Sequence, residues 1–139
     1  MTHPFDLQRF VDAQSQTYAQ ALAELRAGHK RTHWMWFVFP QLAGLGRSGM
    51  AQRFAISGLE EAHGYVAHPV LGRRLVECAR ALTALDTADP VEVFGPVDAM
   101  KLRSSMTLFA VAAPDEPVFR EVLDHYFGGE PDEGTTSLL

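Results

Sequence analysis

Three short segments of the sequence carry side chains that could bind or transform a ligand. The first, at residues 33–41, reads HWMWFVFPQ and holds both tryptophans of the chain between a histidine and a glutamine. The second is the glycine-rich stretch LAGLGRSG at 42–49, and the third is KLRSSMTLF at 101–109. Each sets a few polar groups beside apolar residues, which is the composition of a small-molecule pocket.

The aromatic segment offers an imidazole, two indole N–H groups and an amide, from His33, Trp34, Trp36 and Gln41. A histidine can transfer protons near neutral pH, and an indole can stack on a planar group or donate a hydrogen bond. Alternatively, the histidine is a hydrogen-bonded structural residue and each indole bonds a carbonyl. Large aromatic side chains that point in several directions need burial on most sides, so we expect most of this segment to be core.

The glycine-rich segment formally matches the dinucleotide-binding pattern G-x-G-x-x-G, from Gly44 to Gly49. That pattern has meaning only between a strand and a helix of a βαβ unit, which this sequence does not predict. A local interpretation is that Gly46 lets backbone N–H groups approach an anion, while Arg47 and Ser48 supply further donors. A tight loop with a surface arginine is the alternative.

Three polar residues of the third segment, Lys101, Ser104 and Ser105, share one strip of a predicted helix. The other sides of that helix are largely apolar, which indicates a buried helix. A lysine on a buried helix needs an anionic partner or a wet pocket. Two interpretations stay open: a ligand pocket, or an internal salt bridge with the serines bonded to helix carbonyls. Lys101 and either serine would also form a Ser–Lys nucleophile.

Helical periodicity predicts the elements that position these segments. One long amphipathic helix is expected over residues 6–27, and Gly28 ends it as a left-handed cap. A capping box from Ser57 to Glu60 predicts a short helix to about residue 67. Further helices are expected from 68 to about 85, from 89 to 95, from 96 to about 113 and from 117 to 128.

The pattern as a whole predicts an all-α protein, because period-two alternation is nearly absent. We expect a compact single domain over residues 1–139, made of six or seven packed helices with the HWMWFVFPQ segment buried among them. Residues 5–128 form the predicted core, and the acidic, polar tail 129–139 shows no pattern and is ordered only by docking. On the apolar stripes, Cys78 is expected in the core, and Gln14 is either hydrogen-bonded there or a ligand contact.

Composition limits the classes of function. The chain has 12 basic and 17 acidic residues, and this excess of acid argues against a general nucleic-acid-binding protein. A single cysteine forms no intramolecular disulfide, which suits a reducing compartment. No secretory leader and no apolar run of about 20 residues is visible. We therefore expect a cytoplasmic protein that does not enter a membrane.

Three longer stretches resemble the bacterial and fungal family called domain of unknown function 1810. They are AQSQTYAQALAELRAGHKRTHWMWFVFPQLAGLGRS, AISGLEEAHGYVAHPVLGRRLVE and VFGPVDAMKLRSSMTLF, and the similarity spans about residues 5–138. The blocks that carry it include His33, Trp34, Trp36, Gln41, Gly46, Lys101, Ser104, Ser105 and Thr107. Phe54 departs from the family, where many relatives have tyrosine. The label calpastatin, which some members carry, has no support in this sequence.

The resemblance implies a compact, mainly helical single domain and no known activity, because the family is functionally uncharacterised. From the residues, the leading hypothesis is a pocket for a small anionic, nucleotide-like ligand, with catalysis left open. The candidate catalytic residues are His33, Lys101 and Ser105, and the candidate ligand-binding residues are Trp34, Trp36, Gln41, Gly46, Arg47, Ser48, Lys101, Ser104 and Ser105. The alternative is a non-enzymatic adaptor that binds a protein partner and uses these polar groups as an internal hydrogen-bond network. No metal, cofactor or oligomeric state is predicted.

Overall fold

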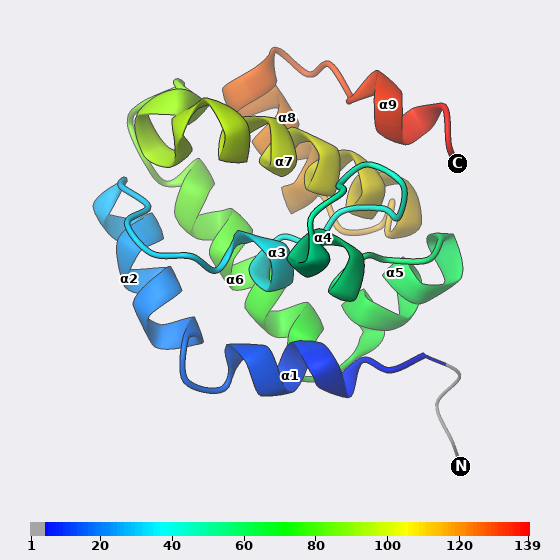
Figure 1. The fold of residues 1–139 in the computed structure, drawn as a ribbon. Coiled ribbons are helices and arrows are strands. Elements are labelled where there is room, and N and C mark those ends of the chain that lie inside the picture. Colours follow the sequence, from blue (N-terminus) through cyan, green and yellow to red (C-terminus); the bar gives the residue numbers. More distant parts are fainter. Residues whose placement is uncertain (1–4) are drawn as a thin grey trace.

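Nine helices follow one another in the computed structural model, which describes residues 5–139 (Figure 1). They are α1 (Gln8–Gln14), α2 (Tyr18–Ala27), α3 (Met35–Val38), α4 (Gly49–Arg53), α5 (Leu59–Ala67), α6 (Leu71–Thr83), α7 (Pro90–Ala112), α8 (Val118–Phe127) and α9 (Glu133–Thr136). Six of them have seven residues or more, and the β structure in these residues is one isolated bridge between Leu42 and Ile56. The predicted all-α domain of six or seven packed helices is confirmed. None of the described helices is long and apolar enough to cross a membrane.

The longest helix is α7, which runs across the upper part of the view in Figure 1. It contacts α5, α8 and α9, while α6 contacts α2, α5 and α8. Its inward residues Leu102, Met106 and Phe109 are fully buried, as the nearly all-round apolar sequence predicts. The expected break within it is confirmed, because Gly95 has a left-handed φ of 78° just before Pro96 and kinks the helix.

The single helix predicted over residues 6–27 is wrong, because the chain forms α1 and α2 with a turn between them. The Ser15 hydroxyl donates to the Asp12 carbonyl at 2.8 Å, and a local side-chain bond of this kind competes with continued helix. Gln14 at the end of α1 is buried and donates to the Phe37 carbonyl at 2.7 Å and the Tyr65 hydroxyl at 3.0 Å. It is therefore a hydrogen-bonded core residue, which was one of its two predicted roles.

The predicted capping box at Ser57 and Glu60 is also wrong. Gly58 precedes α5 without a side-chain cap, and the adjacent Glu61 takes the expected role. The buried Glu61 carboxylate accepts the Ser57 backbone N–H at 2.8 Å and pairs with Arg9 at 3.1 Å. Glu60 is exposed, whereas Glu61 lies on the inward side of α5, from which its carboxylate also reaches Arg9 on α1.

The segment beyond residue 128 packs against α7. Gly128 ends α8 in the left-handed conformation with a φ of 63°, and the chain then turns back to form α9 (Figure 1). The Asp132 side chain caps α9 by accepting the Thr135 N–H at 2.9 Å. Thr135 is fully buried, and its hydroxyl lies 2.9 Å from that of Ser104 on α7.

The aromatic segment is held in place by one buried carboxylate, that of Glu24 on α2. It accepts the backbone N–H groups of Arg31 and Thr32 at 2.7 and 3.0 Å, and the Trp34 indole N–H at 2.9 Å. The Thr32 hydroxyl and the Gln20 amide donate at 2.7 and 2.9 Å. Burial alone raises the pKa of this carboxyl, but these donors outweigh burial and lower the pKa from 4.5 to about 2.

Replacing the carboxylate should therefore destabilise the whole fold. We expect Glu24→Gln to lower the free energy of unfolding by at least about 2 kcal/mol, because buried N–H donors lose their charged acceptor. Gln20→Ala is the matched control, since it removes only an exposed donor to the same carboxylate and should cost under about 1 kcal/mol. Urea unfolding followed by circular dichroism measures both. Equal stability of the two variants would contradict the role given to Glu24.

The lowered pKa also predicts how stability depends on pH. A carboxyl with a folded-state pKa near 2 and an unfolded-state value near 4.5 stabilises the fold fully above pH 4.5. That contribution is lost as the pH falls from 4.5 toward 2. The stability difference between the natural chain and Glu24→Gln should shrink by roughly 2 kcal/mol between pH 7 and pH 3. A difference that stays constant over this range would show that the carboxyl is not the titrating group.

Candidate functional site

The structure brings Lys101 of α7 onto Trp36 of α3. The Lys101 ammonium lies 5.1 Å from the centroid of the Trp36 ring, a cation–π contact between two of the predicted segments. Both side chains are half-buried. Ser105 stands one turn further along α7, on the same strip of the helix as Lys101. The HWMW and KLRSS segments therefore meet at this contact.

Both lysines of the chain converge on a single carboxylate. Lys30 Nζ lies 2.9 Å from Oδ2 of Asp98, and Lys101 Nζ lies 3.6 Å from Oδ1 of the same residue. Lys30 is the more fixed of the two, because its side chain is only 8% exposed and its ammonium also lies 5.2 Å from the Trp34 ring. Two ammonium groups facing one carboxylate leave one positive charge without a counter-charge in this cluster.

Two buried polar atoms in these segments have no hydrogen-bond partner: the indole nitrogen of Trp36 and the hydroxyl oxygen of Ser105. They are the only such side-chain atoms among the described residues. A buried polar group without a partner costs about 1–3 kcal/mol, so each occurrence in a native fold needs an explanation. We call the five residues Lys30, Trp36, Asp98, Lys101 and Ser105 the lysine site.

Ser104, the third polar residue of the strip, has a structural role. Its hydroxyl bonds Thr135 of α9 at 2.9 Å, and both residues are buried. One turn further on, the Thr107 hydroxyl accepts the backbone N–H of Asp132 at 2.9 Å and donates to the Arg103 carbonyl at 2.8 Å. These side chains fasten the C-terminal segment to α7, so Ser104 is covered by α9.

The glycine-rich segment contributes differently from what the anion-nest interpretation expects. Ser48 caps α4, because its hydroxyl accepts the Ala51 N–H at 3.0 Å, and the Arg47 side chain is exposed. A Cβ on Gly46 would lie 2.5 Å from that of Ala51, so close approach of the loop to α4 requires glycine there. Gln41 and Gly46 line a small hollow of about 220 Å³ beside α4. Among the described residues, no hydrogen bond or ion pair joins this loop to the lysine site.

The remaining candidates of the aromatic segment separate into surface and core. His33 is exposed, at the start of the segment. Trp34 is fully buried, and its indole N–H is already bonded to Glu24. The structure therefore places Trp34 in the core, and Trp36 is the indole that retains a free N–H. No group of three or more His, Cys, Asp or Glu side chains that could hold a metal ion occurs within residues 5–139.

Sequence reasoning missed two members of the lysine site. Asp98 precedes Lys101 by three residues on the same helix, and this i, i+3 spacing of opposite charges was a usable signal. Lys30 lies two residues after the predicted helix end at Gly28, where a basic residue suits a helix C-terminus and indicates no site. Its backbone N–H donates to the Val93 carbonyl at 2.8 Å, a contact across 63 positions of sequence that no local pattern reveals.

Comparison with known proteins identifies the family but no activity. A family model described as "Protein of unknown function (DUF1810)" matches residues 4–139. The chain belongs to the DUF1810 family. The crystal structure of the conserved hypothetical protein Rv1873 from Mycobacterium tuberculosis is similar to it, with 52% sequence identity and a TM-score of 0.96. That alignment covers 99% of this chain and 98% of the other, whereas no functionally curated protein matches.

The close approach at Gly46 of this DUF1810 chain predicts a pair of compensating substitutions. Gly46→Ala should cost about 1–3 kcal/mol, because the new methyl group would overlap that of Ala51. Ala51→Gly alone should cost about 1 kcal/mol through its lower helix propensity. The double variant should be more stable than the sum of these losses, since the two methyl groups no longer meet. Thermal unfolding of the four proteins measures the coupling, and simple additivity would contradict the contact.

Proposed function

We propose that the protein binds a small anion beside Lys101, between α3 and α7. Two buried donors without partners support the proposal, Trp36 Nε1 and Ser105 Oγ. Trp36 is the residue whose ring the Lys101 ammonium covers, Ser105 lies one turn from Lys101 on α7, and the two lysines exceed the charge of Asp98. Hydrogen bonds from neutral donors to an anion are stronger than those between neutral groups. An anion held there would satisfy both donors and the extra positive charge at once.

The two lysines differ in a way that suits this role. Lys30 is held at 2.9 Å from Asp98 and is nearly buried, so it can neutralise the aspartate by itself. Lys101 stands at the longer distance of 3.6 Å with a more exposed side chain, so its ammonium is available to a second anion. Because that ammonium covers the Trp36 ring, the indole would serve the anion as a hydrogen-bond donor through its N–H. No base of a nucleotide-like ligand needs to stack on the ring.

The candidate ligand is therefore an oxyanion, either free or as the phosphate of a nucleotide-like molecule. Phosphate and sulfate oxygens accept several hydrogen bonds from different directions, which matches an ammonium, an indole and a hydroxyl as donors. His33, Arg47 and Ser48 lie at the surface and are not needed for this binding. Lys101 and Ser105 also have the functional groups of a Ser–Lys nucleophile, but the contacts of the lysine site support ligand binding alone.

The first test is a titration followed by NMR, because the chain holds only two indole N–H groups. Phosphate, sulfate and AMP are added separately to uniformly ¹⁵N-labelled protein. The Trp36 indole signal should move with a saturable dependence on the anion, while the Trp34 signal, whose N–H is bonded to Glu24, stays in place as the internal control. The same anion at a hundred times its dissociation constant should raise the melting temperature by roughly 10 °C.

Two variants test whether the anion binds at Lys101 and Ser105. Lys101→Ala should abolish the saturable shift of the Trp36 signal, and Ser105→Ala should weaken binding by about tenfold, because one donor to the anion is lost. Arg31→Ala is the matched control, since it removes a nearby exposed cation that is outside the lysine site. If none of the three anions moves the Trp36 signal, or if Arg31→Ala weakens binding as much as Lys101→Ala, the proposal is wrong.

A specific observation also favours the adaptor alternative. Val97 and Met100 on the same part of α7 are 67% and 71% exposed, which is unusual for large apolar side chains. A protein partner that covers them would also cover Lys101. In that case Val97→Asp and Met100→Asp should abolish association with that partner, or with a second copy, and the Trp36 signal should not respond to anions. Light scattering and the NMR titration together separate the two functions.

A further inference from the structure

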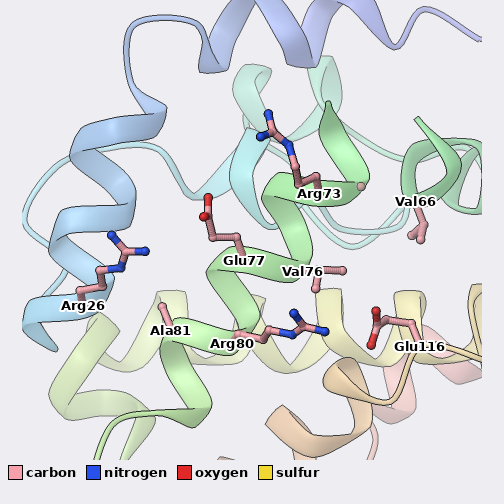
Figure 2. Close-up of a pocket in the computed structure, with 9 residues that line it drawn as sticks. Arg26, Val66, Arg73, Val76, Glu77, Arg80, Ala81 and Glu116 are labelled. Atoms are coloured by element: carbon pink, nitrogen blue, oxygen red, sulfur yellow. The ribbon is translucent and has the colours of Figure 1, made fainter. Parts of the chain in front are cut away.

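A separate hollow of about 650 Å³ lies over the outward face of α6, where α2 and the loop before α8 border it (Figure 2). Three arginines line it: Arg26 from α2, and Arg73 and Arg80 from α6. Figure 2 shows Arg26 reaching from α2 toward α6, and Arg80 pointing along the hollow toward Glu116. None of these residues belongs to the lysine site, so the hollow is a second and independent candidate.

The three guanidinium groups have no partner of their own among the described residues. Arg74, the neighbour of Arg73 on α6, shows the contrast. Its guanidinium donates to Gln14 at 3.3 Å and lies 4.8 Å from the centroid of the Tyr18 ring. Arginine on the inner side of α6 is thus tied to other helices, whereas the arginines around the hollow keep their donors unused.

The two carboxylates in the hollow are already engaged with other groups. Glu77 accepts a hydrogen bond from the Tyr18 hydroxyl. Burial and this bond raise the pKa of Tyr18 well above its ordinary value, so the hydroxyl stays a donor. Glu116 accepts the Val118 backbone N–H at 3.2 Å at the start of α8. Within the described part of the chain neither carboxylate forms an ion pair with these arginines, although Arg80 points toward Glu116 in Figure 2.

Spacing along α6 defines what the hollow can recognise. Arg73, Val76 and Arg80 occupy positions i, i+3 and i+7 of one helix, so they form a stripe in which the two arginine Cα atoms are about 10.5 Å apart along the helix axis. Figure 2 shows the two guanidinium groups pointing in different directions, so a single phosphate would engage both only if both side chains turned toward one point. A nucleic-acid backbone presents negative charge without interruption, so it would also pass close to the carboxylates of Glu77 and Glu116, whereas separate acidic side chains can be placed at the arginines alone. Two separate carboxylates with an apolar group between them match the stripe.

We propose that this hollow is the docking site for an acidic amphipathic helix of a partner protein. Glutamates or aspartates seven residues apart on that helix pair with Arg73 and Arg80, and an apolar side chain between them contacts Val76. Arg26 on the opposite wall pairs with a third acidic residue or a helix C-terminus. The occupant is argued from charge complementarity: three unpartnered cations face outward on a chain whose net charge is −5.

The test uses a fluorescein-labelled, alanine-based helical peptide that has two glutamates seven residues apart and a leucine between them. Its binding to the full chain is followed by fluorescence polarisation at low and at physiological salt. We expect saturable binding that weakens with salt, and a loss of roughly tenfold in the Arg73→Gln/Arg80→Gln double variant, since two exposed ion pairs are removed. Both arginines are exposed, so this variant should fold, which its melting temperature checks.

Three controls make the result specific. Arg31→Gln/Arg120→Gln removes the same charge from exposed arginines elsewhere and should leave binding unchanged. A peptide with glutamine in place of glutamate, and one with the glutamates five residues apart and so on different faces, should bind at least about tenfold more weakly. The proposal is overturned if the matched peptide does not bind at low salt, if the control double variant loses as much affinity, or if a single-stranded RNA oligonucleotide competes for the same arginines more strongly than the peptide.

Discussion

The architecture depends on one buried carboxylate. Glu24 accepts five hydrogen bonds, one from Gln20 on its own helix and four from residues 31–34, and through them it holds the turn after α2 and the start of the aromatic segment. A carboxylate in this position is stable only because every lone pair has a donor, which is also why its pKa is low. Trp34 is oriented by this interaction, and α3 follows it directly.

The geometry of the lysine site depends on these hydrogen bonds of Glu24. Once residues 31–34 are fastened to Glu24, the preceding Lys30 lies beside α7, where its backbone bonds Val93 and its ammonium meets Asp98. Trp36, two residues after Trp34, faces Lys101 on the same helix. A single structural interaction on α2 thus sets the positions of groups on α3 and α7, and a substitution at Glu24 would disturb the candidate site together with the core.

Positive charge on this acidic protein is divided among internal fastening, the lysine site and the arginine-lined hollow. Arg9 and Arg74 bond carbonyls and side chains of other helices, so they act as cross-links between elements. Lys101 is shared between a carboxylate and an aromatic ring, whereas the guanidinium groups of Arg73 and Arg80 have no partner within the described part of the chain. The lysine site and the arginine-lined hollow therefore offer positive charge to a ligand in two separate places.

Local sequence determined the helical class, the left-handed glycine caps at Gly28 and Gly128, the break at Gly95 and the burial of the aromatic segment. Each of these depends on backbone preferences or on periodicity within a few residues, which a single sequence displays directly. The same local information also selected Trp36, Lys101 and Ser105 as polar groups set in apolar surroundings.

Tertiary structure alone decided which of those groups meet. The pairing of Glu61 with Arg9, the pairing of Ser104 with Thr135 and the meeting of both lysines at Asp98 all join residues that are far apart in sequence. Such contacts follow from how helices pack and from which buried polar atoms find partners, and neither is encoded in local periodicity. For the same reason, the two donors without partners could be recognised only after all other hydrogen bonds had been assigned.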